Sequence, residues 1–367
     1  MLDPSSTYSF DDAGRFAEAA RVKVGSGYVY ARWANPTVDA FEAAVAALEG
    51  AEDAEAFSSG MAAIAAVFLG LCRAGDRVVA VRQLYGNTHS LLTDRLPRYG
   101  ITSSLFDLDD FAGIEDALDG ATLLYCETIG NPRIQVADLD RLGDLARGAD
   151  VPLVVDNTFA SPILCRPLEH GATLSLHSAT KFIGGHHDLL GGIVCGDAAT
   201  LEPIKLLGRD IGPTLAPWSA WLALRGLATI AVRVERSCAS ALDVASFLAG
   251  SDEISAVAYP GLDGDASRAL AGRLLGGRGG STLGFDVVGG RARTARFQES
   301  LRLVKPAASL GGVHSLLVHA ASVTHTQLSP EQLGAAGIGE GYCRLSVGLE
   351  DPDDLVADLR QALAASR

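Results

Sequence analysis

Several features that would assign a chain to a particular class of protein are missing from this 367-residue sequence. No apolar run approaches the roughly 18 residues that cross a bilayer, and the opening residues M-L-D-P-S-S-T-Y have neither the basic start nor the apolar stretch of a secretory signal. The six cysteines include no C-x-x-C pair, which argues against a disulfide framework or a zinc site. We therefore expect a cytoplasmic protein whose thiols are free and buried.

Blocks rich in lysine and arginine are also absent, and the formal net charge is -14. Such a surface repels the phosphates of nucleic acids and of anionic lipids, so neither nucleic acid nor a membrane is an expected partner. Hydrophobic residues make up 48% and charged residues 20% of the chain, which is typical of a globular protein with a sizeable interior. The length suits one large catalytic domain and a smaller one.

The first part of the chain divides at Pro36. Residues 1–35 show no clear hydrophobic period and are rich in Gly, Ser and aromatic residues, so we predict an extended N-terminal arm. From Pro36 onwards, apolar residues recur with helical spacing over residues 41–48, and Gly50 stands where a helix C-cap belongs. A helix is therefore predicted between Pro36 and Gly50.

Short apolar runs then alternate with helical patterns, of which Asp138–Arg147 is an example. The predicted strands are Arg77–Val81, Ile101–Phe106, Thr122–Cys126, Pro152–Val155, Thr173–Leu176 and Gly192–Cys195. This alternation predicts a mainly parallel sheet with helices on both faces, in a large α/β domain at 36–225.

A long helical pattern, roughly Pro217–Gly250, is expected to lead from this domain into a second one. The C-terminal part carries three strand-like runs and a final helix, at Ile254–Ala258, Thr282–Val288, Cys343–Val347 and Asp353–Ala364. We therefore predict that residues 226–367 form a connector helix and a smaller α+β domain.

Polar residues follow three of the predicted strands immediately. The polar segments are E-T-I-G-N-P (127–132), D-N-T (156–158) and H-S-A-T-K (177–181). Ligands of open α/β sheets bind outside the carboxyl ends of the strands, so three such endings in succession predict a shared site.

Two residues in these segments have the character of functional groups. Asp156 follows four apolar residues and should be partly buried, where it either caps the next helix or pairs with a cation such as a protonated pyridine nitrogen. Lys181 lies beside two hydroxyls in S-A-T-K, which suits a phosphate ligand or a lysine that binds a ligand covalently, the alternative being an exposed surface lysine. It is not a Walker A lysine, because G-x-x-x-x-G-K-[ST] is absent.

Two further motifs are less specific. Ser58-Ser59-Gly60-Met61 precedes the apolar helical stretch Ala62–Leu71, where it is either an anion site at a helix N-terminus or an ordinary cap. His186-His187-Asp188 invites a metal site, but no second cluster has ligand spacing and H-E-x-x-H is missing. We therefore favour a glycine-flanked loop over a metal centre.

Taken in chain order, these pieces resemble the Cys/Met-metabolism pyridoxal 5′-phosphate (PLP) enzymes. This trans-sulfuration family includes cystathionine γ-synthase, cystathionine γ-lyase, methionine γ-lyase and O-acylhomoserine sulfhydrylase. The similar segments span nearly the whole chain and are Y-V-Y-A-R-W-A-N-P-T (28–37), L-E-G (48–50), S-S-G-M-A-A-I (58–64), Y-G-N-T (85–88), E-T-I-G-N-P (127–132), V-D-N-T-F-A-S-P (155–162), H-S-A-T-K-F-I-G-G-H (177–186), L-A-L-R-G-L-A-T (222–229), S-L-G-G-V-H-S-L (309–316) and R-L-S-V-G-L-E (344–350).

The resemblance implies a role for individual residues. Lys181 would bind PLP covalently and move protons together with Tyr85, which also stacks on the cofactor ring. Asp156 would pair with the pyridine nitrogen and Asn131 would contact the phenolic oxygen. The phosphate would be held by Ser59, Gly60, Met61, Ser178 and Thr180 and, across a subunit interface, by Tyr30 and Arg32. The substrate α-carboxylate would bind to Ser309 and Arg344, and no metal is implied.

The resemblance also implies an aspartate-aminotransferase-like fold, and a homotetramer built from two catalytic dimers. The expected reaction is γ-elimination from a sulfur amino acid such as methionine or homocysteine, giving an α-keto acid, ammonia and a thiol. The alternative is γ-replacement on an O-acylhomoserine, as in a sulfhydrylase or a cystathionine γ-synthase.

Several positions depart from common patterns of the family: Asn87, Ser90, Ile129, His314 and Ala320. Ser90 stands where members that handle cystathionine often carry Arg, and His314 replaces a frequent acidic residue. These departures concern substrate choice or assembly, and none concerns the residues implied for the cofactor.

Overall fold

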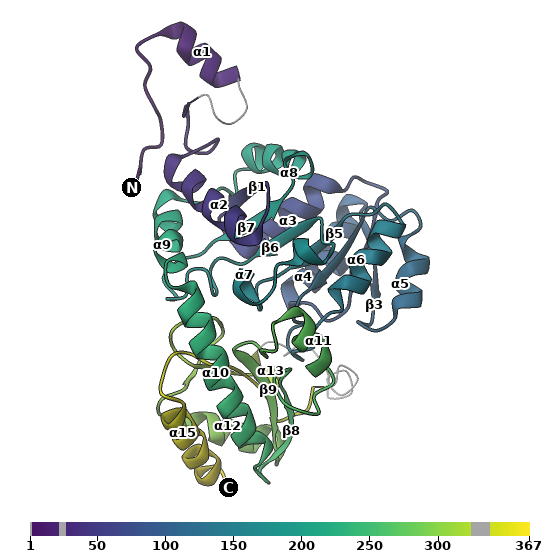
Figure 1. The fold of residues 1–367 in the computed structure, drawn as a ribbon, viewed down its shortest axis with the longest axis vertical. Coiled ribbons are helices and arrows are strands. Elements are labelled where there is room, and N and C mark those ends of the chain that lie inside the picture. Colours follow the sequence, from purple (N-terminus) through teal and green to yellow (C-terminus); the bar gives the residue numbers. More distant parts are fainter. Residues whose placement is uncertain (1, 22–26, 324–337) are drawn as a thin grey trace.

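The computed structural model describes residues 2–21, 27–323 and 338–367 and is built around two sheets (Figure 1). The larger sheet has seven strands in the order β1-β7-β6-β5-β4-β2-β3. They are β1 (Asp53–Phe57), β2 (Arg77–Val81), β3 (Thr102–Phe106), β4 (Leu123–Glu127), β5 (Leu153–Asp156), β6 (Leu174–His177) and β7 (Gly192–Gly196). Strand β7 runs antiparallel to both neighbours and the other adjacent pairs are parallel, which confirms the predicted mainly parallel sheet.

Six of these strands, β2 to β7, match the predicted ones to within one residue at each end. The sequence does not predict β1, whose segment D-A-E-A-F alternates acidic residues with alanine. Ala54 and Ala56 are buried while Asp53 and Glu55 are partly exposed. The strand therefore has the period of a half-buried strand, but alanine is too small to give a strong apolar signal.

Helices cover both faces of the larger sheet. One face is covered by α2 (Pro36–Glu49), α5 (Phe111–Leu118), α6 (Leu139–Gly148) and α9 (Pro217–Leu227), which share one apolar core. The other is covered by α3 (Gly60–Leu71) and α8 (Ala198–Ile211) in a second core. Short helical segments complete this part, at α4 (Gly86–Ser90), η1 (Leu91–Arg95), η2 (Leu96–Tyr99), α7 (Ser161–Leu164) and η3 (Pro167–His170).

Helix α2 confirms the helix predicted between Pro36 and Gly50. The Asn35 side chain caps its start by accepting the N–H groups of Thr37 and Val38. Gly50 is left-handed, with φ 70°, and its N–H donates to the Ala46 carbonyl at the other end. Within the described ranges of the chain, no helix is long and apolar enough to cross a membrane.

The second sheet has five strands in the order β10-β11-β12-β9-β8. They are β8 (Ile254–Ala258), β9 (Thr282–Val287), β10 (Lys305–Pro306), β11 (Leu316–His319) and β12 (Tyr342–Ser346). The longer helices α10 (Ile230–Ala249) and α15 (Pro352–Ala365), with α12 (Gly290–Ser300), pack on it in a third apolar core. The remaining helices are α11 (Arg268–Leu274) and α13 (Ala320–Val323). The predicted strands β8, β9 and β12 are confirmed, while β10 and β11 are too short to stand out in the sequence.

Two expectations are corrected by the structure. The helical pattern over 217–250 is two helices, because the chain leaves the helix at Ala228 and Thr229, next to the close approach of Gly226 to the loop at 183–184.

The arm is not wholly extended: α1 (Ala13–Arg21) forms within it and stands away from the body of the molecule (Figure 1). Its start is marked by Asp12, whose side chain accepts the Arg15 N–H at 2.7 Å.

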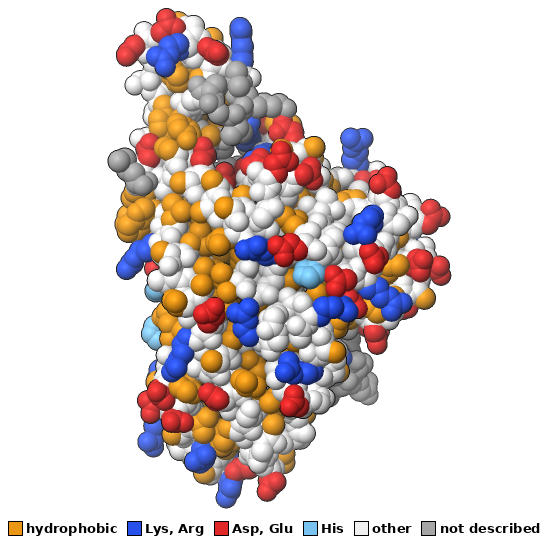
Figure 2. Space-filling view, viewed as in Figure 1, with side chains coloured by type: hydrophobic (Ala, Val, Ile, Leu, Met, Phe, Trp, Pro, Cys, Tyr) orange, Lys and Arg blue, Asp and Glu red, His pale blue; other side chains and the backbone are white. Residues whose placement is uncertain are grey.

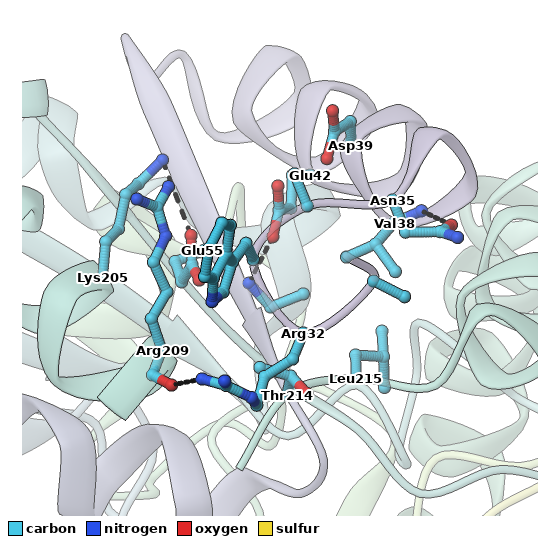
Figure 3. Close-up of a pocket in the computed structure, with 14 residues that line it drawn as sticks. Arg32, Asn35, Val38, Asp39, Glu42, Glu55, Lys205, Arg209, Thr214 and Leu215 are labelled. Atoms are coloured by element: carbon cyan, nitrogen blue, oxygen red, sulfur yellow. Dashed lines mark hydrogen bonds and ion pairs between the residues drawn. The ribbon is translucent and has the colours of Figure 1, made fainter. Parts of the chain in front are cut away.

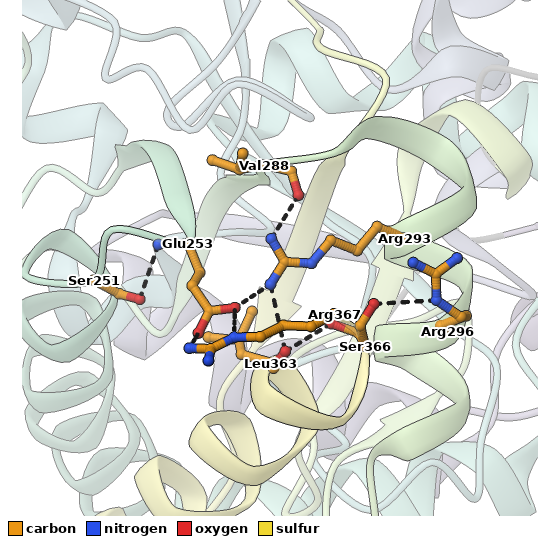
Figure 4. Close-up of polar contacts among 8 residues, drawn as sticks. All are labelled: Ser251, Glu253, Val288, Arg293, Arg296, Leu363, Ser366 and Arg367. Atoms are coloured by element: carbon orange, nitrogen blue, oxygen red, sulfur yellow. Dashed lines mark hydrogen bonds and ion pairs between the residues drawn. The ribbon is translucent and has the colours of Figure 1, made fainter.

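A charged cluster ties the last helix to the second sheet (Figure 4). Glu253 forms ion pairs with Arg293 of α12 and with Arg367, whose Nη2 lies 2.7 Å from Glu253 Oε1. Arg296 Nε also donates to the Ser366 carbonyl at 3.1 Å. This cluster lies at the end of the molecule far from the larger sheet (Figure 1). We therefore interpret its role as structural: it holds the end of α15 against the second sheet.

Candidate active site

The three polar segments predicted to share a site lie at neighbouring strand ends. Glu127, the last residue of β4, is paired with Asp156, the last residue of β5. Asp156 is in turn paired with Leu176 of β6, one residue before His177. The side chains that follow these strands are therefore collected at one edge of the sheet, where open α/β sheets bind ligands.

Asp156 is a buried carboxylate with 8% of its surface exposed. Its Oδ1 accepts the Thr158 N–H at 2.9 Å, and Oδ2 lies 3.5 Å from the Tyr125 hydroxyl. It does not cap a helix, because α7 begins only at Ser161. Among the described residues no Lys or Arg forms an ion pair with it, and burial raises its pKa. An uncompensated buried carboxylate is costly, so this position fits a cationic ligand atom.

Lys181 lies in the loop after β6 and extends towards the second sheet. Its Nζ donates to Ser309 Oγ at 3.0 Å. Burial, followed by the positive charge of Arg344, lowers the pKa of the Lys181 ammonium to about 8. With that pKa, about a tenth of the amine is neutral at pH 7, and the neutral form is the one that acts as a nucleophile or a proton acceptor.

Arg344 of β12 brings a buried guanidinium to the same place. Nη1 donates to Asn131 Oδ1 at 2.9 Å, and Nη2 donates to the Ser309 carbonyl at 3.3 Å. In the part of the chain that the structure describes, no Asp or Glu side chain forms an ion pair with it. A fork of N–H groups without a carboxylate partner suits the binding of a ligand carboxylate.

The expected phosphate residues surround the start of α3. Ser59 is the N-cap of this helix and its Oγ accepts the Ala62 N–H at 3.1 Å. A Cβ at Gly60 would lie 2.7 Å from Ser178 Cβ, so only glycine lets these two segments come so close. Thr180 Oγ accepts the Gly191 N–H at 3.1 Å, and Met61 is partly buried next to Gly60. Small residues and a helix N-terminus therefore form a cradle suited to an anion.

Tyr85 stands at the start of α4 with 42% of its surface exposed. Its backbone N–H donates to Glu127 Oε1 at 2.5 Å, which joins it to the strand end next to Asp156. Its hydroxyl accepts a hydrogen bond from Asn87 Nδ2 at 3.1 Å. The ring is therefore held by its backbone at the edge of the site and remains available to contact a ligand.

Tyr30 and Arg32 are not brought to this cluster within one chain. Arg32 lies 5.5 Å over the Tyr30 ring and donates to the Arg209 carbonyl of α8. It lines a small pocket that also contains Glu55 and Lys205 and includes neither Lys181 nor Asp156 (Figure 3). Within a single chain, these two arm residues therefore do not contribute to the phosphate cradle, as the sequence analysis expects them to do across a subunit interface.

The loop at 186–188 faces a cleft of about 570 Å³ that His187 and Ser309 help to line. His186 and Asp188, like His187, are exposed. Over residues 2–21, 27–323 and 338–367, no group of three or more His, Cys, Asp or Glu side chains is arranged to hold a metal ion. The loop therefore belongs to the mouth of the cleft.

Several residues that support the site have no role in the sequence analysis. Thr158 Oγ accepts the Ser178 N–H at 2.8 Å and so links the segments after β5 and β6. Glu49 Oε1 lies 2.5 Å from His177 Nε2 and accepts Asn157 Nδ2 at 3.3 Å, with all three side chains buried. For Glu49 the available signal is a charged residue at the buried end of an apolar helix, just before the cap at Gly50, whereas the other three residues belong to the polar segments predicted to follow the strands.

Comparisons with known proteins show which proteins this chain is similar to. A family model described as Cys/Met metabolism PLP-dependent enzyme matches residues 1–364. The O-succinylhomoserine sulfhydrylase of Pseudomonas aeruginosa is 40% identical over 99% of this chain and 90% of its own length. The L-methionine gamma-lyase of Pseudomonas putida is 41% identical over 93% of this chain and 86% of its own. The cystathionine gamma synthase structure from Xanthomonas oryzae pv. oryzae is similar with a TM-score of 0.93 and 36% identity, over 100% of this chain and 92% of that one.

Proposed function

The chain belongs to the Cys/Met metabolism PLP-dependent enzymes, and we propose that its main reaction is γ-elimination from a sulfur amino acid such as methionine or homocysteine. The products are an α-keto acid, ammonia and a thiol, and one water molecule is consumed. The cofactor is PLP.

One observation carries this proposal: the Lys181 amine and the Arg344 guanidinium meet at the same residue. Lys181 Nζ donates to the Ser309 hydroxyl at 3.0 Å, and Arg344 Nη2 donates to the Ser309 carbonyl at 3.3 Å. An α-carboxylate bound to Arg344 would therefore place the α-amino group and the α-proton next to the lysine. That is the arrangement that a lysine-dependent reaction at an amino acid requires.

The described residues fit PLP. The buried Asp156 carboxylate suits the protonated pyridine nitrogen, the cradle of Gly60 and Ser178 suits the phosphate, and Asn131 suits the phenolic oxygen. When bound, PLP supplies an electron sink for a carbanion next to the amino group. Asp156 would keep the ring nitrogen protonated, which would sustain that property.

The remaining steps are assigned to side chains of the chain itself. Arg344 and Ser309 orient the substrate through its carboxylate. The neutral Lys181 amine takes the proton from the α-carbon and then one from the β-carbon, which allows the sulfur on the γ-carbon to leave. The same amine returns protons to the substrate, since its pKa of about 8 suits both directions. We assign to Tyr85 the donation of a proton to the departing sulfur, because its ring is exposed and it is close enough to Arg344 to interact with that charge.

The second candidate is γ-replacement on an O-acylhomoserine. It is favoured by the 40% identity to an O-succinylhomoserine sulfhydrylase, which is within one percentage point of the 41% identity to the methionine lyase. Both reactions use the same cofactor residues. A product assay separates them: methionine, homocysteine, cysteine, cystathionine and O-acylhomoserines are each supplied with and without sulfide. Keto acid formed without a thiol supports the lyase, whereas homocysteine formed only with sulfide and an O-acylhomoserine refutes it in favour of replacement.

Cystathionine is expected to be a poor substrate compared with methionine, by on the order of a hundredfold in kcat/KM. Its distal amino-acid head needs charged partners, and the positions that often supply them in the family carry Ser90 and His314. Serine offers a neutral hydrogen bond of roughly 0.5–1.5 kcal/mol where a charged partner gives about 1.5–3 kcal/mol. A neutral imidazole cannot replace an acidic partner for ammonium, and a protonated one repels it.

Steady-state kinetics on the two substrates test this prediction. The double variant Ser90→Arg/His314→Glu is the matched gain-of-function control. It is expected to reduce the difference in kcat/KM between methionine and cystathionine. A clear preference of the unmodified enzyme for cystathionine would show that the distal pocket binds its charged head by another route.

We further propose that the protein is a homotetramer with active sites shared across a dimer interface. Exposed apolar side chains gather on the side of the molecule formed by α9 and α10, where Trp218, Val232 and Leu242 are 58%, 64% and 42% exposed (Figure 2). An apolar surface of this kind favours association between subunits. Tyr30 and Arg32, which have no site within their own chain, would then reach the phosphate of a neighbour.

Mixing Arg32→Ala subunits with Lys181→Ala subunits is expected to restore up to about a quarter of the wild-type activity, because half of the random dimers are hybrids with one intact site out of two. Native mass spectrometry establishes that subunits have exchanged. If activity stays at the level of the separate variants after proven exchange, each site is built from one chain.

The cytoplasmic location remains a proposal from the sequence. It is supported by the six cysteines, all of which are buried and unpaired, as is usual in a reducing compartment.

A further inference from the structure

Arg233 of α10 is a buried arginine outside the site described above. It has 6% of its surface exposed, and within the described residues it forms no ion pair with an Asp or Glu. An uncompensated guanidinium is costly to bury, so its donors must be met by other strong acceptors.

Those acceptors belong to the loop that carries the cofactor lysine. Arg233 Nη1 donates to the Phe182 carbonyl at 2.8 Å, and Nη2 lies 3.5 Å from the Ile183 carbonyl. These are the two residues directly after Lys181. Nη2 also donates to the Gly226 carbonyl at 2.7 Å, and Nε donates to Thr229 Oγ at 3.0 Å. One guanidinium therefore joins the lysine loop to the junction between α9 and α10.

The backbone around Arg233 is shaped to receive it. Gly185 has φ +73°, and a Cβ there would lie 2.1 Å from Arg233 Nη1. Gly226 approaches the loop so closely that a Cβ would lie 2.3 Å from the Ile183 carbonyl oxygen. Two glycines thus make room for the guanidinium and for the carbonyls that surround it.

The same loop reaches the substrate side of the site. The Gly185 N–H donates to the Lys181 carbonyl at 2.7 Å, which closes a turn around the lysine. The Gly185 carbonyl accepts the Val313 N–H at 3.0 Å, and Val313 belongs to the segment that begins at Ser309. A side chain that fixes this turn therefore fixes where the Lys181 amine stands relative to Ser309 and Arg344.

We infer that Arg233 is a positioning residue for the reaction: its guanidinium holds the turn after Lys181 so that the amine is aligned with the carboxylate site at Ser309 and Arg344. This inference rests on the proposed role of Lys181. Arg233 contacts no reacting atom, so its effect is on alignment and on the environment of the amine. A misplacement of about 1 Å in an active site can cost on the order of a hundredfold in rate.

The test uses Arg233→Ala and Arg233→Lys, with Arg236→Ala as the matched control because Arg236 is an exposed arginine of the same helix. We expect kcat to fall roughly a hundredfold in Arg233→Ala and about tenfold in Arg233→Lys, since lysine keeps the charge but not the fork. The KM for the amino acid stays within about threefold, because Arg344 and Ser309 are untouched. Arg236→Ala retains the wild-type kcat.

Two readouts separate positioning from mere stabilisation. The pKa of Lys181 in the cofactor-free protein is measured by the pH dependence of its acetylation, followed by mass spectrometry. Burial and the charge of Arg344 lower this pKa to about 8 in the wild type, and it should rise in both Arg233 variants, because a loosened loop admits water to the amine. A rise in Arg233→Lys, which keeps the positive charge, shows that geometry is the cause. Millimolar guanidinium should also restore kcat severalfold in Arg233→Ala and leave the wild type unchanged.

The inference is overturned if both variants keep the wild-type pKa of Lys181 and lose kcat only in proportion to a lower melting temperature. Should Arg233→Ala fail to fold, Arg233→Lys alone decides through the same pKa measurement. Reductive trapping of the cofactor in the wild type is run in parallel. If Lys181 is not labelled there, the proposed function fails; if it is labelled and the Arg233 variants behave as the wild type, only the positioning role fails.

Discussion

Replacement of Lys181 by alanine is expected to leave the fold intact and to lower turnover by at least about 10⁴-fold. Proton transfer by one positioned side chain contributes about 10² to 10⁴, and loss of the covalent link to the cofactor adds to this. The wild-type amine is prepared for both tasks, since burial and Arg344 lower its pKa to about 8.

Keto acid release and circular dichroism, measured on the same preparation, check this prediction. Lys305→Ala is the matched control, because Lys305 is exposed and its Nζ donates to the Arg302 carbonyl, away from the site. Turnover by Lys181→Ala within tenfold of the control would mean that another group performs the chemistry.

The second large effect is expected from Arg344→Ala, which should raise the KM for the amino acid while the cofactor stays bound. Removing one partner of a buried charge pair costs roughly 2–5 kcal/mol, which corresponds to about thirtyfold to several-thousandfold in affinity at about 1.4 kcal/mol per tenfold. Asn131 and Ser309 would keep their places but lose the guanidinium that they accept from.

Substrate titration of the cofactor absorbance measures this change directly. Arg344→Lys is the informative companion: it retains a charge but cannot present two parallel N–H groups, so its KM should lie between those of the wild type and the alanine variant. If the KM is unchanged in Arg344→Ala, Arg344 does not bind the substrate α-carboxylate.

The parts of the fold that the sequence predicts well are those with strong apolar runs. Strands β2 and β4 to β7 are short, almost wholly buried segments bounded by turns, and β3 is a partly exposed one; run length and flanking turns identify all six to within a residue. Strand β1 is not predicted because its buried residues, Ala54 and Ala56, contribute little hydrophobicity. The break between α9 and α10 is not predicted for a different reason. It depends on the contact between Gly226 and the loop at 183–184, and this contact between distant segments leaves no local sequence pattern.

The residues of the candidate site also fall into two groups: those that the local sequence indicates and those that it does not. Asp156 and Lys181 stand out in the sequence because each follows a buried strand, and the register of β4, β5 and β6 then places those strand ends side by side. Arg344 lies on β12 of the second sheet and Ser309 in the loop between β10 and β11, and nothing local points to them; the family resemblance alone suggests them. Arg233 is hidden further, since its function depends on three carbonyls from other segments.

The central claim is that Lys181 carries the cofactor, and reductive trapping tests it most directly. The chain has four lysines: Lys23, Lys181, Lys205 and Lys305. The purified protein, loaded with PLP, is treated with borohydride, digested, and searched by mass spectrometry for a lysine bearing the reduced cofactor. The account predicts a stoichiometric label on the peptide that contains Lys181 and bleaching of the cofactor absorbance. A label on Lys23, Lys205 or Lys305 in its place would contradict it.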